Sequence, residues 1–117
     1  LQVRRLIRDE FASVFEQCDV LLGPTTPAPA FPLGEMNDPL SMYLCDRYTV
    51  NANIAGICGV SLPSGFTEVD GRRLPLGIQL QAPALGEATL LRAARMFEAA
   101  TDHHLVRPEL NATVDES

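Results

Sequence analysis

The sequence predicts an α/β fold in which helices flank a mixed β-sheet. Two stretches, 1–18 and 87–101, carry apolar residues three and four positions apart and predict amphipathic helices. Between them, the strand-like runs 60–69 and 74–82 are separated by the turn sequence at 70–73. A turn of this kind between two such runs predicts a hairpin or another tight return, so the chain combines helices with paired strands.

The composition indicates one globular domain. The chain has 117 residues, of which 46% are hydrophobic, and this is enough to form a core. Its net charge of -6 disfavours a non-specific nucleic-acid surface. No apolar run reaches the ~18 to 20 residues that span a bilayer, and no signal-peptide pattern is present. We therefore expect a cytoplasmic protein that makes no membrane contact. Its three cysteines lack the spacing of a disulfide framework.

The first predicted helix, 1–18, starts without a residue of the kind that caps a helix. This start leads us to expect that the chain is one part of a longer polypeptide. Residues 19–23 then form a short apolar run that Pro24 ends. Such a run predicts a buried strand, which we expect to be parallel to its neighbours.

Residues 24–39 contain five prolines and predict an extended surface loop. Loops of this kind rim pockets in some proteins, and plain connectors are more common. The following residues, 40–55, predict a helix. Asp38 is the expected N-cap of this helix, and Pro39 occupies the first helical position.

The stretch 46–66 predicts a buried helix that leads directly into a strand. It is small and apolar, with three glycines that permit close backbone approach or positive φ. Asp46 stands at its start. A carboxylate in this position faces water, pairs with an arginine, or binds a cationic group of a ligand. From the residues alone, pairing with Arg47 or helix capping stays open as the alternative to ligand binding.

The strand 74–82 alternates between two kinds of residue. Leucine, isoleucine and alanine side chains share one face, and the other face carries a glycine and two glutamines. One face is therefore apolar, and the other is polar or close-packed. The helix 87–101 follows, with Glu87 favourably placed in its first turn. We expect the polar tail, 109–117, to be disordered.

Several chemistries are excluded or weakly supported. All nine basic residues are arginine, so no mechanism that needs a lysine is complete within this chain. His103 and His104, with the serines and aspartates of the chain, supply the residue types of a Ser-His-Asp site, but no Gly-x-Ser-x-Gly motif is present. Two adjacent histidines at a helix end more commonly interact with the negative end of the helix dipole. Cysteine and histidine pairs with zinc-ligand spacing are also absent from the sequence.

Short segments in a fixed order resemble the C-terminal portion of the amidase-signature family. Within that family they are most similar to the A subunits of the glutamyl-tRNA(Gln) and aspartyl-tRNA(Asn) amidotransferases. The block around 38–49, with its Asp-Pro-Leu, Met-Tyr and Tyr-Thr pairs, favours these A subunits over other amidases. The segments that carry the resemblance are 3–7, 19–27, 38–43, 46–50, 53–56, 60–66, 74–80 and 87–91.

The resemblance implies that residues 1–108 are the C-terminal part of an amidase domain. In this family a serine, activated through a second serine by a lysine, attacks an amide carbonyl. These groups lie upstream of the matching segments, so the chain alone is expected to be inactive and to hold no catalytic residue. It also implies no cofactor or metal in this chain, with ATP and magnesium used by the B subunit of the amidotransferase. The implied partners are the B and C subunits, glutamine as substrate, and tRNA only through the complex.

The resemblance also implies a substrate-binding role for four residues. Asp46 matches the aspartate that receives the α-ammonium group of glutamine. A carboxylate in that place selects an amino acid over a plain amide. Tyr43, Tyr48 and Thr25 are expected to form walls of the same pocket.

Two alternatives remain open. The chain is part of another amidase-signature hydrolase, or it is a structural or partner-binding module without activity. An enzyme for plain apolar amides has no use for an ammonium-binding carboxylate, so the role of Asp46 discriminates the first alternative from the amidotransferase.

Overall fold

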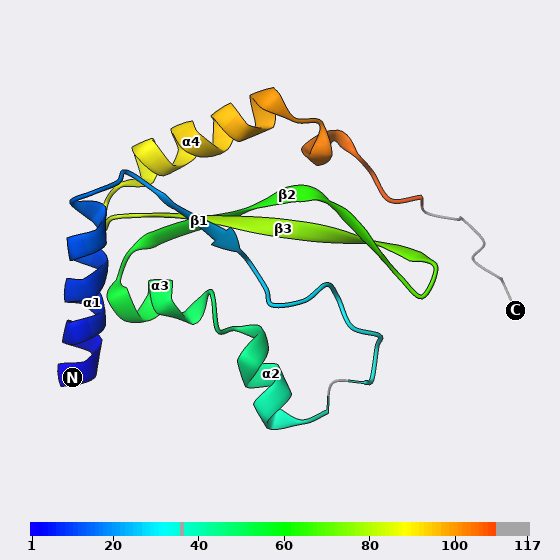
Figure 1. Ribbon diagram of the computed structural model, residues 1–117, viewed down its shortest axis with the longest axis horizontal. Helices are drawn as coiled ribbons and strands as arrows, with labels where there is room; N and C mark the ends of the chain where they lie inside the picture. The colour runs from blue at the N-terminus through cyan, green and yellow to red at the C-terminus, as the bar shows by residue number, and fades with distance from the viewer. Residues whose placement is uncertain (36, 110–117) are drawn as a thin grey trace, which may run out of the picture.

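The computed structural model describes residues 1–35 and 37–109, and the predicted disordered tail lies outside this part except for its first residue. Helices and strands follow one another around a small sheet (Figure 1). The elements are α1 (Gln2–Phe15), β1 (Leu21–Pro24), α2 (Pro39–Cys45), α3 (Val50–Ala55), β2 (Cys58–Val69), β3 (Arg72–Ala82), α4 (Glu87–Ala100) and a 3₁₀ helix, η1 (His103–Leu105). No helix in the described ranges is long and apolar enough to cross a membrane.

The sheet has the strand order β1-β3-β2, and both pairings are antiparallel. β2 and β3 form the predicted hairpin, in which Val69 pairs with Arg72. The two turn residues, Asp70 and Gly71, both have positive φ, at 50° and 75°. Two such residues in a two-residue loop match the twist of the flanking strands. The sequence therefore predicted this hairpin correctly.

The predicted direction of the first strand was wrong. β1 runs antiparallel to β3, with Leu21 opposite Gln81 and Pro24 opposite Ile78. The predicted burial was wrong as well, because β1 is an edge strand on which Leu22 is 68% exposed. A short apolar run carries no information on strand direction or on which side of the strand a neighbour covers. The direction depends on a partner strand that lies more than fifty residues further along the chain.

The predicted helix over residues 40–55 is divided into α2 and α3. Residues 46–49, which we call the linker 46–49, form a turn between them, and the backbone of Asp46 has φ -92° and ψ 2°. Asp38 caps α2 as predicted, because its Oδ1 accepts a hydrogen bond from the Leu40 N–H at 3.2 Å. α3 ends at Gly56, whose φ of 69° is a left-handed conformation that glycine adopts without strain.

The core lies between the hairpin and α4. Its most buried apolar side chains come from both strands and from the inner face of the helix, and they are Leu62, Leu80, Ala82, Leu90 and Ala94. Burial of such side chains is the main favourable term for packing α4 on the sheet. α2 and α3 lie on the other side of the hairpin (Figure 1). One face of β3 therefore packs on α4, and the opposite face, on the side of α2 and α3, carries the candidate site.

Candidate functional site

Two glutamines on β3 are buried on the face of the sheet opposite α4. Gln79 is 9% exposed and Gln81 is 8% exposed. Side chains alternate between the two faces of a strand, so Leu80 and Ala82 face the core while the glutamines face the other way. A buried amide group is costly unless it forms hydrogen bonds. The partners of these two amides therefore define the organisation of this face.

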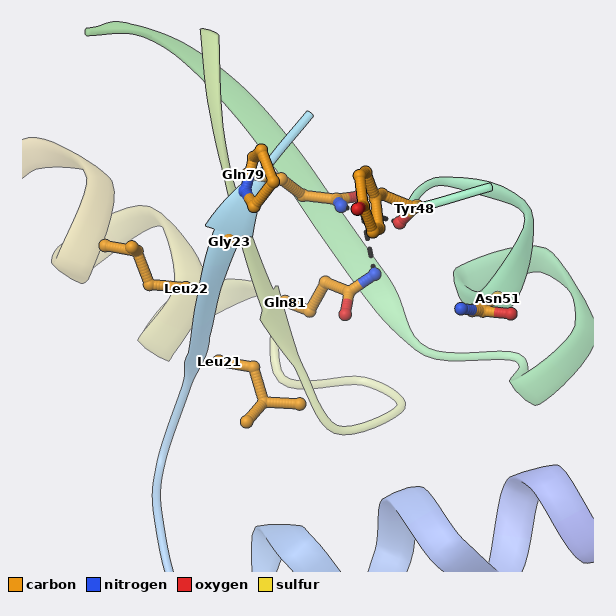
Figure 2. Close-up of a pocket in the computed structure, with 8 residues that line it drawn as sticks. Leu21, Leu22, Gly23, Tyr48, Asn51, Gln79 and Gln81 are labelled. Carbon is orange, nitrogen blue, oxygen red and sulfur yellow. Dashed lines mark hydrogen bonds between the residues drawn. The ribbon is translucent and has the colours of Figure 1, made fainter. Parts of the chain in front are cut away.

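The glutamines form a short relay that ends on the linker 46–49. The Gln81 Nε2 group donates to Gln79 Oε1 at 3.4 Å, and Gln79 Nε2 donates to the carbonyl oxygen of Tyr48 at 2.8 Å (Figure 2). Because Gln79 Oε1 accepts from Gln81, its amino group is left for the Tyr48 carbonyl. β3 is thereby joined to the turn between α2 and α3.

A cavity of about 150 Å³ lies beside this relay. Its walls come from β1, from β3, from the linker 46–49 and from the first turn of α3, and Figure 2 shows the side chains around it. The amides of Asn51, Gln79 and Gln81 give it hydrogen-bond donors and acceptors, and its lining carries no charged side chain. This chemistry suits a neutral polar group. The lining residues are Leu21, Leu22, Gly23, Pro24, Tyr48, Asn51, Gln79 and Gln81.

Thr25 lies on the same face of the sheet, just after β1. Its hydroxyl shares a hydrogen bond of 2.8 Å with the hydroxyl of Ser61 on β2. Both oxygens lie over Gly77 of β3, and a methyl group at that glycine would be 3.1 Å from each of them. Positions 77 and 79 face the same side of the strand. The structure thus places Thr25 and Tyr48 on one face, at successive positions along β3.

Asp46 follows the last residue of α2, and its side chain is exposed. Its backbone carbonyl accepts hydrogen bonds from the N–H groups of Thr49 and Val50, at 3.0 and 2.9 Å. Within the described residues, its carboxylate has no ion-pair or hydrogen-bond partner. The guanidinium of Arg47 lies instead over the ring of Tyr48, 5.5 Å from its centroid. Pairing of Asp46 with Arg47, the structural alternative, is therefore not observed.

The four predicted substrate-binding residues fall into two groups. Thr25 and Tyr48 lie along the polar face of the sheet. Asp46 is two residues before Tyr48 in the same turn, and Tyr43 is exposed on α2. Of the four, only Tyr48 lines the 150 Å³ cavity.

The roles of Gln79, Gln81, Asn51 and Ser61 were not predicted from the sequence. A signal was present in β3, where glutamines alternate with a continuous apolar face. Alternation identifies which residues share a face, but it does not say whether the polar face meets water or another part of the chain.

The remaining polar candidates pack rather than gather into a site. His103 stacks on Phe97 with ring centroids 6.3 Å apart, and its ring lies 3.6 Å from the position of a methyl group at Gly65. In the part of the chain that the structure describes, no three His, Cys, Asp or Glu side chains are arranged to hold a metal ion.

The family model for Amidase matches residues 1–91 of this chain, which is more than half of its length. The chain therefore belongs to the amidase family. Within the family it is similar to A subunits of glutamyl-tRNA(Gln) amidotransferase. It is 53% identical over 109 residues to the A subunit of glutamyl-tRNA(Gln) amidotransferase from Rhodopirellula baltica, covering 92% of this chain and 21% of that protein. Identity to the A subunit from Chromohalobacter salexigens is 55% over 107 residues, with the same coverage of both chains.

A solved structure gives the same result for the fold. The crystal structure of the glutamyl-tRNA(Gln) amidotransferase A subunit from Thermotoga maritima matches with a TM-score of 0.76 and 39% sequence identity, over 86% of this chain and 21% of that one. The predicted α/β fold and the predicted resemblance are both confirmed. The chain spans about a fifth of the length of the relatives that it matches.

Proposed function

We propose that this chain forms part of the glutamine-binding pocket of an amidotransferase A subunit. That A subunit would release ammonia from glutamine for the conversion of Glu-tRNA(Gln) to Gln-tRNA(Gln), or of Asp-tRNA(Asn) to Asn-tRNA(Asn). One observation carries the proposal. About half of the residues are identical, over more than nine-tenths of the chain, to proteins with this name.

The division of labour within the A subunit follows from the chemistry. Attack of a serine oxygen on the glutamine carboxamide forms an acyl-enzyme and releases ammonia, and water then hydrolyses the acyl-enzyme to glutamate. Activation of the serine through a second serine needs a lysine, and this chain contains none. The bond-breaking groups would therefore belong to the other four-fifths of a protein of the relatives' length. The present chain would contribute to recognition only.

Asp46 would receive the α-ammonium group of glutamine. Its carboxylate is exposed and carries no partner among the described residues, so it is available for a cationic group. A charge-assisted hydrogen bond between carboxylate and ammonium is roughly twice as strong as a neutral one. The Asp46 carboxylate would also disfavour amides that lack the amine, because it would stay unpaired when such an amide is bound. Tyr43, Tyr48 and Thr25 would form walls around the bound amino acid.

Replacing Asp46 in a complete A subunit tests this role. Asp46→Ala should raise the KM for glutamine at least about 30-fold, while kcat changes little. This factor is the equivalent of about 2 kcal/mol, the low end for loss of one partner of a charge pair that is buried once the substrate is bound. The second readout is glutaramate, which has the same carboxamide and carboxylate but no amine. The preference for glutamine over glutaramate, measured as the ratio of kcat/KM values, should largely disappear.

Asp9→Asn supplies the control, since Asp9 is an exposed carboxylate on α1, far along the chain from the linker 46–49. It should leave both kinetic constants unchanged. An Asp46→Ala variant with normal glutamine KM and normal preference over glutaramate would remove Asp46 from the pocket.

The proposal extends to the assembly in which the A subunit works. The B and C subunits would be its partners, tRNA would be reached only through the complex, and ATP and magnesium would be used by the B subunit. The setting would be cytoplasmic. The name shared by the relatives, an amidotransferase acting on glutamyl-tRNA(Gln), supports this extension.

A further inference from the structure

We infer that Gln79 is a positioning residue that holds the linker 46–49, and with it the Asp46 carboxylate, at a fixed place above the sheet. The inference rests on the proposed function, in which Asp46 binds the ammonium group of glutamine. Gln79 lines the 150 Å³ cavity, but both ends of its amide are occupied by Tyr48 and Gln81, so it would not bind the substrate or the reacting atoms itself. It would act through the Tyr48 carbonyl.

The linker 46–49 has little rigidity of its own. It joins helices of seven and six residues, and helices this short are marginal without tertiary contacts. Local hydrogen bonds from Thr49 and Val50 to the Asp46 carbonyl set the shape of the turn. They do not fix where the turn lies relative to the sheet.

The bond from Gln79 to Tyr48 supplies that connection. Among the described residues, it is the only hydrogen bond between the linker 46–49 and a strand. It is short, at 2.8 Å, and the Gln79 side chain is buried in the sheet face. The bond is part-buried, so its loss would leave the Tyr48 carbonyl to water and release the linker 46–49 from the sheet.

The neighbouring glutamine selects the useful orientation of the Gln79 amide. An amide group can turn over and present either its oxygen or its nitrogen. With Gln81 Nε2 donating to Gln79 Oε1, the nitrogen is directed to the Tyr48 carbonyl. In this arrangement Gln81 orients the Gln79 amide, and Gln79 contacts the linker 46–49.

Tyr48 and Asp46 lie in the same hydrogen-bonded turn, so a shift of the Tyr48 carbonyl moves the Asp46 backbone with it. An ion pair between a carboxylate and an ammonium weakens quickly when the two groups are displaced. Loosening the tether should therefore weaken ground-state binding of glutamine. The chemical step on the carboxamide, at the other end of the substrate, should be affected much less.

A double-mutant cycle in the complete A subunit tests the inference. Methionine matches glutamine in length and lacks the amide. Gln79→Met should raise the glutamine KM about 5- to 10-fold with a small change in kcat. In Asp46→Ala/Gln79→Met, the KM should equal that of Asp46→Ala alone, because the tether acts through a carboxylate that is already absent. Effects that multiply in the double variant, or an unchanged KM in Gln79→Met, would overturn the inference.

Leu90→Ala is the matched control for general destabilisation. Leu90 is buried in the core on the opposite face of the sheet, in a cluster that includes no residue of the linker 46–49. The KM of the Leu90→Ala variant for glutamine should stay at the wild-type value, although this variant is less stable. A raised KM in this variant would show that any loss of stability weakens binding, and would count against a specific tether.

Hydrogen–deuterium exchange provides a readout that does not depend on glutamine. The amides of Thr49 and Val50 should exchange faster in Gln79→Met than in the wild type, and Leu90→Ala should leave them unchanged relative to the rest of the domain. If Gln79→Met does not fold, Gln81→Met takes its place and should give the same pattern with smaller effects. A normal KM in Asp46→Ala would reject the proposed function, whereas a raised KM there with no effect at Gln79 would reject this inference alone.

Discussion

Asp38 shows how a single exposed carboxylate organises the start of a helix. The Ser41 hydroxyl donates to Asp38 Oδ2 at 3.0 Å, and the Leu40 N–H donates to Oδ1 at 3.2 Å. Both bonds favour the ionised form, the Ser41 bond most, so the pKa of Asp38 lies below its ordinary value of 3.8. The pKa is lower in the folded protein than in the unfolded chain. The stabilisation of α2 by the cap is therefore fully present at pH values above the ordinary pKa of 3.8. This contribution is lost as the pH falls through the folded-state pKa.

We therefore expect acidification to loosen α2 while the hairpin and α4 persist. An NMR titration should find the midpoint of the Asp38 carboxyl below 3.8, and Ser41→Ala should move it back toward that value. The Leu40 amide should report the same transition. An Asp38 that titrates at or above 3.8, with a Leu40 amide that does not respond, would contradict the role of the cap.

At the residue scale, local features were predictable and long-range ones were not. The Asp38 cap and the glycine at the end of α3 follow from preferences that act within one helical turn. The bond from Gln79 to Tyr48 joins positions 31 residues apart, and it depends on the turn that divides α2 from α3. The role of Asp46 was taken from a family resemblance, and it stays a prediction.

At the scale of the element, α4 depends on a narrow apolar stripe. Leu90 is 3% exposed and belongs to the core, whereas the adjacent Leu91 is 59% exposed. Leu90→Ala removes buried methyl groups and leaves a cavity, so we expect a loss of about 2 to 5 kcal/mol. Leu91→Ala has the same chemistry at an exposed position and should stay within about 0.5 kcal/mol of the wild type. Denaturant midpoints of the two variants, compared in the complete A subunit, measure the difference; equal midpoints would mean that α4 does not pack as the structure shows.

Periodicity predicted the outer helices and the hairpin because each is determined by residues close together in sequence. It failed for β1, since the direction of a strand is set by a distant partner. It also failed for the middle of 40–55, where the pattern stays helical through residues that form a turn. The linker 46–49 needs the sheet on one side to hold it, and that contact is invisible in a helical pattern. The candidate site thus sits where local propensity gives way to tertiary contacts.

At the scale of the whole molecule, the chain buries little for its length. Its radius of gyration is 17.5 Å, against about 13 Å for a compact domain of this size. Large apolar side chains are exposed on several elements, among them Leu6 on α1, Leu22 on β1 and Met96 on α4. The relatives are about five times longer, and their additional chain is available to cover such surfaces. Exposed apolar surface of this extent otherwise promotes association.

This difference in context predicts that one substitution will have opposite effects in two settings. Leu6 is 62% exposed here, so Leu6→Gln should reduce concentration-dependent self-association of the 117-residue chain, as followed by sedimentation or light scattering. In the complete A subunit the same change should lower the denaturation midpoint, because a polar amide would then be buried against the rest of the domain. Arg92→Gln, at an exposed position of α4, should change neither quantity. If Leu6→Gln had no effect in either setting, this face of α1 would be exposed to water in the complete protein. The remainder of an amidase domain would then pack on another part of the chain's surface.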